Sequence, residues 1–293
     1  MKLIVKDTPL SNLYPYLVSA IGPRPICFAS TIDKAGNPNL SPFSFFNIFS
    51  ASPPILIFSP LRRMRDNTVK QTLENIYEVK EVVVNIVNYE IIQQMNLSSC
   101  EYPKGVNEFI KAGLTPLESE IVKPFRVKES PVQMECNVIQ IIETGKEKGA
   151  GNLILCEILC LHIEDKILDE KGKIDQHKID LVGRLGGDYY TRSTGNAIFE
   201  IPKPNTQLGI GIDALPESIR KSTVLTGNNL GQLANVHEMP FVDPAFYDDK
   251  LKSIIQYYSI NPDEMDKELH RHAKELLDAG KVNEAWQVLL ADV

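Results

Sequence analysis

The chain of 293 residues is 43% hydrophobic and 24% charged, which is enough apolar material for one large core, or a main domain with an appendage, and argues against disorder or a fibre. Its net charge of −7 argues against a nucleic-acid partner, because duplex binding needs a concentrated basic surface. The sequence has no apolar run of about 18 residues that could span a membrane and no signal-peptide pattern at its start. We therefore expect a cytoplasmic protein that binds neither nucleic acid nor membrane.

Residues 1–204 are predicted to be mainly β with short helical insertions. The expected strands are apolar or alternating, at residues 25–31, 54–59, 81–87, 130–144 and 152–168. Helices are expected to begin at Asp66-Asn67-Thr68, where the side chains can cap free N–H groups, over residues 89–98, and in VNEFIKA, which ends at Gly113. Many strands with few short helices favour a closed or partly closed barrel over alternating βαβ units.

A domain boundary is predicted near residue 204, where FEIPKPNTQLG brings two prolines and then polar residues. Beyond it the pattern is helical, over residues 213–221, 228–236, 245–259, 263–279 and 282–291. We therefore expect a β domain at 1–204 and a C-terminal all-α extension at 205–293, which carries no catalytic signature.

Metal and hydrolytic sites are not expected. The five cysteines are scattered, odd in number and without a Cys-x-x-Cys pair, which favours reduced core thiols. Cys156 and Cys160 lie four apart in a predicted strand, so they should share one face and pack together. His270 and His272 lie two apart in a predicted helix and point in different directions. The lack of Gly-x-Ser-x-Gly and His-Glu-x-x-His patterns argues against a hydrolase or metalloprotease.

The first candidate binding segment is GNPNLSPFSFFNIFSASPP (36–54), which places small polar residues among phenylalanines. Ser41 and Ser44 would let a flat ligand approach the main chain, and Asn47 would supply a donor and an acceptor. This mixture suits a planar heteroaromatic cofactor. The alternative left open is an aromatic-rich strand whose serines face solvent.

The second candidate is LRRMRDNTV (61–69), in which three arginines precede the expected helix start. A helix N-terminus has free N–H groups and the positive end of the helix dipole, and an arginine fork fits phosphate oxygens. The segment therefore suits a phosphate, although a solvated basic loop with an ordinary cap remains the alternative.

The third candidate is GRLGGDYYTRSTG (183–195), where paired glycines stand beside tyrosines and arginines. Such a segment favours close approach of its backbone by a ring or by a neighbouring subunit. A plain turn followed by a strand is the alternative.

Together these segments resemble the flavin-reductase-like, FMN-binding split-barrel family. The resemblance covers about residues 15–204 and follows the order SAIGPRPICFAST, NLSPFSFFNIFSASPPILIFS, RDNT, EVVVNIV, YPKGVNEFIKAGLTP, ESPVQMEC and GRLGGDYY. It implies a small split β-barrel that forms a homodimer, with FMN near the subunit interface. The helical extension is not part of the family pattern.

The resemblance also implies the residues that bind FMN. Ser44, Phe45, Phe46 and Asn47 would line the flavin ring and its ribityl chain, Ser30 and Thr31 the ring edge, and Lys104 and Tyr189 a second tier of contacts. Arg65, Asp66 and Thr68 match the phosphate-binding run of the family. Asn67 is an insertion between Asp66 and Thr68, a departure from the family pattern.

The function that we expect is an NAD(P)H:flavin reductase, in which hydride passes from NADH or NADPH to bound FMN. No catalytic side chain is predicted, because the chemistry belongs to the cofactor and the protein sets position and electrostatics. A flavoredoxin-like electron carrier without intrinsic NAD(P)H activity, served by a redox partner protein, is the first alternative. A barrel that has lost its flavin and acts as an interaction scaffold is the second.

Overall fold

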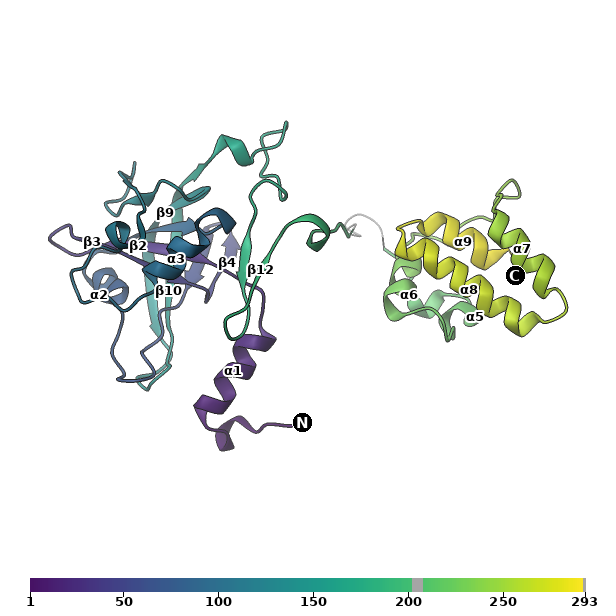
Figure 1. The fold of residues 1–293 in the computed structure, drawn as a ribbon, viewed down its shortest axis with the longest axis horizontal. Helices are drawn as coiled ribbons and strands as arrows, with labels where there is room; N and C mark the ends of the chain where they lie inside the picture. The colour runs from purple at the N-terminus through teal and green to yellow at the C-terminus, as the bar shows by residue number, and fades with distance from the viewer. Residues whose placement is uncertain (202–207, 292–293) are drawn as a thin grey trace. The chain divides into compact units, whose positions relative to one another are not determined.

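The computed structural model describes residues 1–201 and 208–291. The chain divides into two compact units, Met1–Phe199 and Glu200–Val293 (Figure 1). The predicted boundary between residues 204 and 205 lies outside the described residues. No described helix is long and apolar enough to cross a membrane.

The first unit is built on a seven-stranded antiparallel sheet with the order β3-β2-β6-β9-β10-β5-β4. Its strands are β2 (Cys27–Ile32), β3 (Pro38–Phe43), β4 (Phe46–Ala51), β5 (Pro54–Phe58), β6 (Glu81–Ile86), β9 (Val132–Glu143) and β10 (Asn152–Ile163). The edge strands β3 and β4 are consecutive in the chain and are joined by Ser44 and Phe45 alone. Opposite edges can meet in this way only if the sheet rolls up. The predicted split barrel is therefore confirmed, with its closed corner at Ser44 and Phe45.

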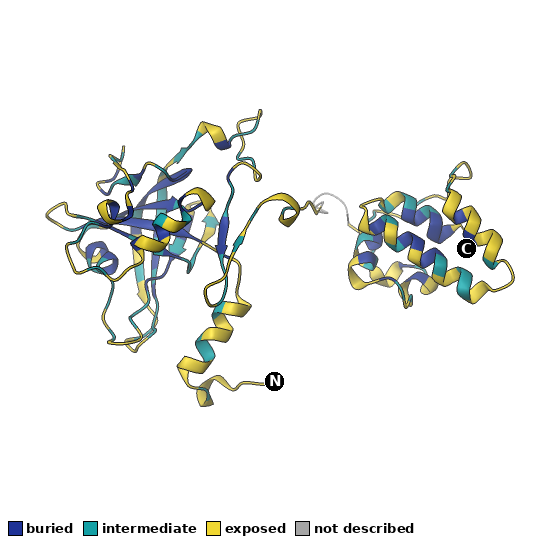
Figure 2. Ribbon diagram, viewed as in Figure 1, coloured by how far each residue is buried: buried dark blue, intermediate teal, exposed yellow. Residues whose placement is uncertain are grey.

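Two apolar clusters hold the barrel together, one on each face of β2 (Figure 2). Cys27 and Ala29 face the barrel interior, into which α2 (Gln71–Glu78) packs Leu73 and Ile76. Phe28 faces the other way, into a cluster with residues of α3 (Ile92–Ser98) and α4 (Glu108–Ala112). Burial on both faces explains why β2 reads as a continuous apolar run.

In the first unit the predicted end of α4 is confirmed, whereas α1 (Leu10–Ala20) was not predicted. Gly113 ends α4 in the left-handed conformation, with φ of 65°, as expected for a glycine at this position. The unpredicted helix, α1, contains Pro15 and buries none of its residues. Arg24 fixes the end of α1, since its guanidinium donates to the carbonyls of Val18 at 2.5 Å and Ile21 at 2.7 Å.

The long β9–β10 hairpin corrects the prediction for Cys156 and Cys160. Cys156 lies opposite Val138 and is buried in the barrel core, as period-2 alternation predicts. A β-bulge at Leu159 inserts one residue, so Cys160 lies opposite Glu135 on the other face of the sheet. The two cysteines therefore do not pack together. The sequence pattern gave no sign of the bulge.

Smaller elements complete the first unit. They comprise a three-stranded sheet of β1 (Arg24–Pro25), β11 (Val182–Arg184) and β12 (Tyr190–Arg192), a two-stranded sheet of β7 (Pro116–Leu117) and β8 (Arg126–Val127), and the 3-10 helices η1 (Val5–Asp7), η2 (Tyr89–Ile91), η3 (Asp165–Ile167) and η4 (Gly195–Ala197).

The second unit is helical, as predicted. Its described elements are η5 (Ile212–Ala214), α5 (Glu217–Arg220), α6 (Gly227–Ala234), α7 (Asp249–Tyr258), α8 (Pro262–Asp278) and α9 (Val282–Leu290). Pro262 stands at the start of α8, where its missing N–H costs nothing. The unit has its own core, in which Trp286 is fully buried among residues of α6, α8 and α9. A separate core is what an independently folding unit requires.

Candidate functional site

A cavity of about 360 Å³ lies beside β3 in the first unit. Its walls are β3 itself, the loop that precedes α2, the start of α2, and the loop that follows α3. The lining residues are Asn39, Ser41, Arg63, Thr68, Val69, Lys70, Gln71, Glu74, Ser98, Ser99, Cys100, Glu101, Tyr102, Lys104 and Glu108. The volume falls within the range of about 300–1,000 Å³ that is typical of small-molecule sites.

One side of this cavity concentrates positive charge. The Arg63 guanidinium donates to Thr68 Oγ1 at 2.9 Å and to the Val69 carbonyl at 2.7 Å, which fixes it in the cavity wall. Lys70 lies next to it in the wall, with its ammonium 4.9 Å from the centre of the Phe43 ring. Burial, and after it the Arg63 charge, lower the pKa of Lys70. Within the described parts of the chain Lys70 forms no ion pair, and the charges of Glu101 and Glu108 offset only part of the lowering of its pKa.

The cavity lining also carries carboxylates and a third cation. Lys104 is paired with Glu74 at 2.5 Å, and Glu101 is paired with Arg63 at 3.5 Å. Glu108 is almost fully buried, accepts the Leu40 N–H at 3.0 Å, and has its pKa raised by burial. Arg63 and Lys70 are therefore adjacent cations in the cavity lining, with carboxylates near both.

The loop at 61–70 differs from its prediction. Residues 66–68 do not begin a helix; they form a turn, and α2 begins at Gln71. The Asp66 carboxylate accepts the Thr68 N–H at 3.0 Å and the Thr68 hydroxyl at 2.7 Å, and these bonds hold the pKa of Asp66 well below its usual range. An aspartate that accepts hydrogen bonds from the residue two positions later closes a turn. In the sequence it cannot be distinguished from an aspartate that caps a helix.

The inserted Asn67 is accommodated by the backbone of this turn. Its φ is 64°, in the left-handed region that asparagine tolerates better than most residues. Its side chain accepts from Arg62 Nε at 2.9 Å and donates to the Lys146 carbonyl at 3.0 Å. The insertion is absorbed in this way, and Thr68 reaches the cavity wall.

We expect Asn67→Gly to be more stable than Asn67→Ala by about 1 kcal/mol. Both variants lose the same side-chain hydrogen bonds, but only glycine adopts the left-handed conformation at no steric cost. Urea unfolding of the two variants measures the difference. Equal stability would mean that the turn opens when the Asn67 side chain is removed.

The structure divides the predicted phosphate residues. Thr68 lines the cavity, as does Lys104. Arg65 and Asp66 do not: Arg65 is 63% exposed, donates to Asp66 at 2.9 Å, and forms a second ion pair with Glu101. Arg63 and Lys70, which were not among the predicted phosphate residues, line the cavity in place of Arg65 and Asp66. The run of arginines pointed to Arg63 only as one of three, and nothing in the sequence distinguished Lys70.

The predicted ring-binding residues lie at the barrel corner. Ser44, Phe45 and Phe46 are half-buried, and Asn47 is exposed. The Phe45 carbonyl accepts the Ser59 N–H at 2.8 Å, which ties the corner to the end of β5. These residues are not part of the cavity lining, but they continue the strand that carries Asn39 and Ser41. Their contact with a flavin ring stays a prediction.

The remaining predicted contacts occupy three different surroundings. Thr31 is buried and accepts from Asn75 of α2 at 3.1 Å. Ser30, its neighbour on β2, faces the opposite side of the strand, is fully buried, and its hydroxyl has no partner among the described residues. Tyr189 is 75% exposed between β11 and β12 and does not line the cavity. Their role in binding stays a prediction.

Comparisons with known proteins agree on one family. Residues 20–177 match the model of the flavin reductase like domain. An uncharacterized protein of Aquifex aeolicus is 40% identical over 201 residues, which are 69% of this chain and 100% of that protein.

Solved structures give the same result. Nitrilotriacetate monooxygenase component B from Bacillus cereus is similar with a TM-score of 0.64 and 28% identity, over 69% of this chain and 98% of that chain. A protein from Shewanella frigidimarina named as a flavin reductase with split barrel domain has a TM-score of 0.58 and 26% identity, over 68% of this chain and 96% of that chain. The family model covers more than half of the chain, and the rolled sheet is the split barrel of these neighbours. These similarities support a flavin-related oxidoreductase, and the chain belongs to the flavin reductase like domain family.

Proposed function

We propose that this protein is an NAD(P)H:flavin reductase that holds FMN with its phosphate in the cavity beside β3. The observation that supports the proposal is the pair of adjacent cations, Arg63 and Lys70, in a cavity lined by Asn39 and Ser41 of β3, the strand that leads into the closed corner of the barrel. The similarity to a protein named as a flavin reductase supports the reaction class.

The residues present fit a phosphate monoester. Lys70 is desolvated and, among the described residues, has no carboxylate paired with it, so a dianion would stabilise its charged form. Arg63 Nη1 donates to Thr68 Oγ1 at 2.9 Å and to the Val69 carbonyl at 2.7 Å, which leaves its Nη2 group to donate to a phosphate oxygen. A neutral ligand would add nothing to the partial compensation that Glu101 and Glu108 give the Lys70 charge.

In the proposed mechanism the chain binds and orients, and the cofactor carries the redox chemistry. Bound flavin would supply a hydride acceptor for the nicotinamide and an electron donor for the next acceptor. Arg63 and Lys70 would hold the phosphate, Thr68 would keep Arg63 in place by accepting from it, and Ser44–Asn47 would present main chain and apolar surface to the ring. Lys104 would place a positive charge at the cavity rim, where Glu74 orients it.

The buried polar side chains behind the cavity keep its wall in place. Asn39 donates to Thr72 Oγ1 at 3.0 Å and to Thr31 Oγ1 at 3.4 Å, which links β2, β3 and α2. A fully bonded network of this kind is rigid. It would therefore hold the phosphate side of the site at a fixed distance from the barrel corner.

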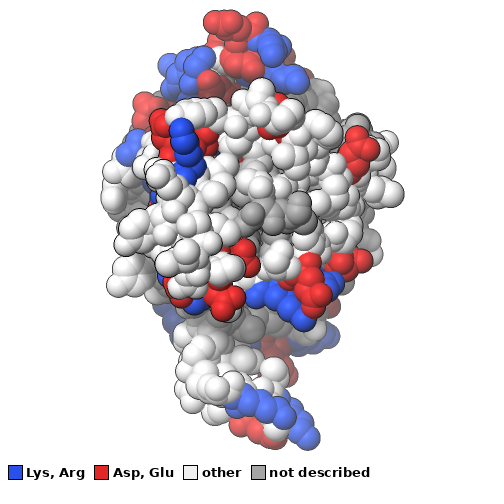
Figure 3. All heavy atoms as spheres, turned by 90° about the vertical axis from the view of Figure 1, so that its right-hand side faces the viewer, with Lys and Arg blue, Asp and Glu red and all other residues white. Residues whose placement is uncertain are grey.

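We also propose that the protein is a cytoplasmic homodimer. Ile48 and Phe49 on the edge strand β4 are 62% and 64% exposed, and α1 leaves Leu10, Leu17 and Ile21 exposed. Exposed apolar side chains on an unpaired edge strand suit a subunit interface. All five cysteines are free thiols, which suits a reducing compartment. In Figure 3, lysine and arginine side chains stand beside aspartate and glutamate side chains, unlike the concentrated basic surface of a nucleic-acid-binding protein.

The test is a turnover assay. Purified protein with FMN should oxidise NADH or NADPH under air, with a rate that saturates in nucleotide. A protein that retains FMN but is reduced only by a protein donor would instead be the flavoredoxin-like carrier. A chain that binds no FMN in a titration would exclude both.

Deletion of residues 210–293 is expected to leave FMN affinity within about twofold, because the second unit has its own core and none of its described residues lines the cavity. Fluorescence titration of FMN compares the truncated and the full chain. Loss of flavin from a truncated protein that remains folded by circular dichroism would place part of the site in the deleted unit.

A further inference from the structure

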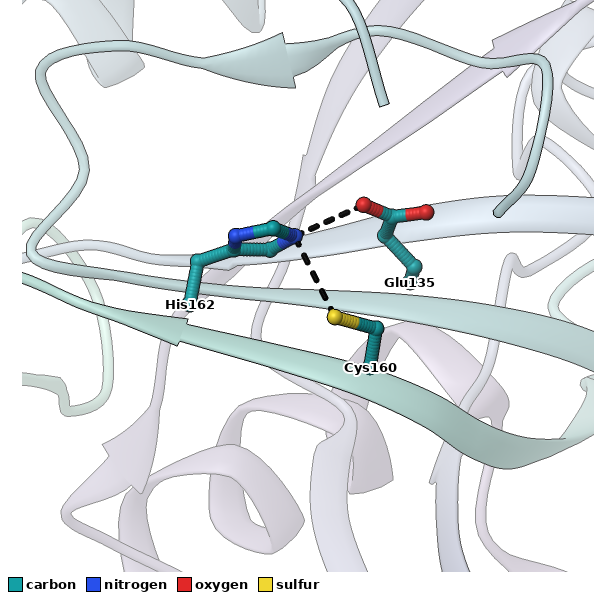
Figure 4. Close-up of side chains that lie close together, drawn as sticks. All are labelled: Glu135, Cys160 and His162. Carbon is teal, nitrogen blue, oxygen red and sulfur yellow. Dashed lines mark hydrogen bonds and ion pairs between the residues drawn. The ribbon is translucent and has the colours of Figure 1, made fainter. Parts of the chain in front are cut away.

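Three atoms that commonly bind metals converge on the outer face of the β9–β10 hairpin, outside the lining of the flavin cavity (Figure 4). His162 Nε2 lies 2.7 Å from Glu135 Oε1 and 3.5 Å from Cys160 Sγ. The three ligand atoms all lie within 4.8 Å of one another. In the described part of the chain this is the only such cluster of three histidine, cysteine or acidic side chains.

The β-bulge creates this cluster. Glu135 points away from the barrel core, since its neighbours Met134 and Cys136 point into it. Without the bulge at Leu159, Cys160 would follow Cys156 into the core. With it, Cys160 stands directly opposite Glu135, and His162, two residues on, shares the same face.

Backbone N–H groups hold Glu135 in one orientation. The carboxylate is fully buried, and it accepts from Glu120 N at 2.8 Å, Ile121 N at 2.7 Å and Val122 N at 3.0 Å. These donors fix the carboxylate and stabilise its charged form. Outer hydrogen bonds that orient a carboxylate ligand are typical of metal sites.

The geometry does not fit a nucleophile–base–acid relay. In such a relay the two ring nitrogens of the histidine contact different partners. Here the same nitrogen, Nε2, faces both Cys160 and Glu135, so the three side chains point at a common centre and not along a chain.

The distances approach those around zinc. Bonds of about 2.0–2.1 Å to nitrogen and about 2.3 Å to sulfur place the two ligand atoms about 3.6 Å apart across a tetrahedral angle. The observed Sγ–Nε2 distance is 3.5 Å. The Nε2–Oε1 distance of 2.7 Å must widen, to about 3.4 Å by the same bond lengths. The His162 side chain is 21% exposed and can turn outward to allow this.

We propose that Glu135, Cys160 and His162 bind a Zn²⁺ ion. The ion takes the place of the hydrogen between His162 Nε2 and Glu135. His162 binds as the neutral imidazole, with its hydrogen on Nδ1, and Cys160 binds as the thiolate, so the thiol proton is released to solvent. Carboxylate and thiolate together balance the two positive charges. A thiolate, imidazole and carboxylate set favours zinc over magnesium or calcium. The half-exposed Cys160 and His162 leave a fourth position open to water or to a small ligand.

The test measures zinc binding by the full chain, stripped with a chelator, in competition with a chromophoric zinc indicator. We expect one Zn²⁺ per chain, and at least a tenfold weaker affinity in both Cys160→Ser and His162→Gln. Cys100→Ser is the matched control, because Cys100 is an exposed thiol outside the cluster, and it should leave the affinity unchanged. Glu135 is not substituted, since it anchors the 120–122 loop.

Co²⁺ provides a second readout that depends on the ligand. Its thiolate charge-transfer band should appear in the difference spectrum of the wild type and of Cys100→Ser, and be absent from Cys160→Ser. Thermal unfolding without metal checks that each variant is folded. Zinc affinity that is equal in Cys160→Ser and wild type, or a cobalt band that persists in Cys160→Ser, would overturn the proposal.

Discussion

Lys70→Gln is expected to weaken FMN binding by about 10- to 100-fold while leaving riboflavin binding unchanged. Hydrogen bonds to charged groups contribute about 1.5–3 kcal/mol, and Lys70 is the desolvated cation of the cavity without an ion pair among the described residues. Riboflavin lacks the phosphate, so the ratio of the two dissociation constants isolates the phosphate contact. Fluorescence titrations with both flavins give this ratio.

Lys80→Gln is the matched control. Its ammonium also lies over an aromatic ring, 5.4 Å from the centre of Tyr77, but outside the cavity lining. It should change neither affinity. An equal loss of FMN and riboflavin in Lys70→Gln would mean that Lys70 supports the ring or the fold, and no loss would place the phosphate elsewhere.

Lys70 determines how FMN affinity changes with pH. Burial and Arg63 lower the pKa of Lys70 in the free protein, so its neutral form appears at a lower pH than for an exposed lysine. Only the charged form attracts phosphate, and FMN affinity should therefore fall as the pH rises through this lowered pKa. The slope should be absent from Lys70→Gln.

Leu277→Ala is expected to destabilise the second unit by about 2–5 kcal/mol without changing FMN binding. Leu277 is 2% exposed and packs in the core of the helical unit. Trp286 is the single tryptophan of the chain and lies in that same core, so its fluorescence reports on this unit alone. Urea unfolding followed by Trp286 fluorescence should shift to lower urea.

Leu56→Ala is the matching variant for the first unit, since Leu56 is 1% exposed in the barrel core. It should lower the urea concentration at which FMN is released and leave the Trp286 transition unchanged. A single transition that shifts in both variants would show that the two units unfold together.

The sequence predicted those features that depend on local pattern. Apolar runs bounded by turn residues located β2, β5, β6, β9 and β10 but not the edge strands β3 and β4. Gly113 marked the end of α4 because a left-handed residue is needed there. The resemblance added the split-barrel fold, which periodicity alone does not contain. The order of the strands in the sheet and the corner at Ser44 and Phe45 were not predicted.

The errors share a physical cause. Asp66 bonds to its own turn, and this local bond is indistinguishable in sequence from a helix cap. Lys70 is important because of what buries it, and the neighbours that do so are distant in the chain. α1 is held through Arg24, which reads in sequence as an ordinary charged residue. Each depends on tertiary contacts that a linear pattern does not record.

Leu159 has an effect out of proportion to its side chain, which is 44% exposed. A strand alternates between its two sides, so the odd or even count of residues decides which side each later residue takes. Removing Leu159 would exchange the sides from Cys160 onward, and would direct a thiol and an imidazole toward the apolar interior. At this point the number of residues, more than their chemistry, determines what the hairpin presents to solvent.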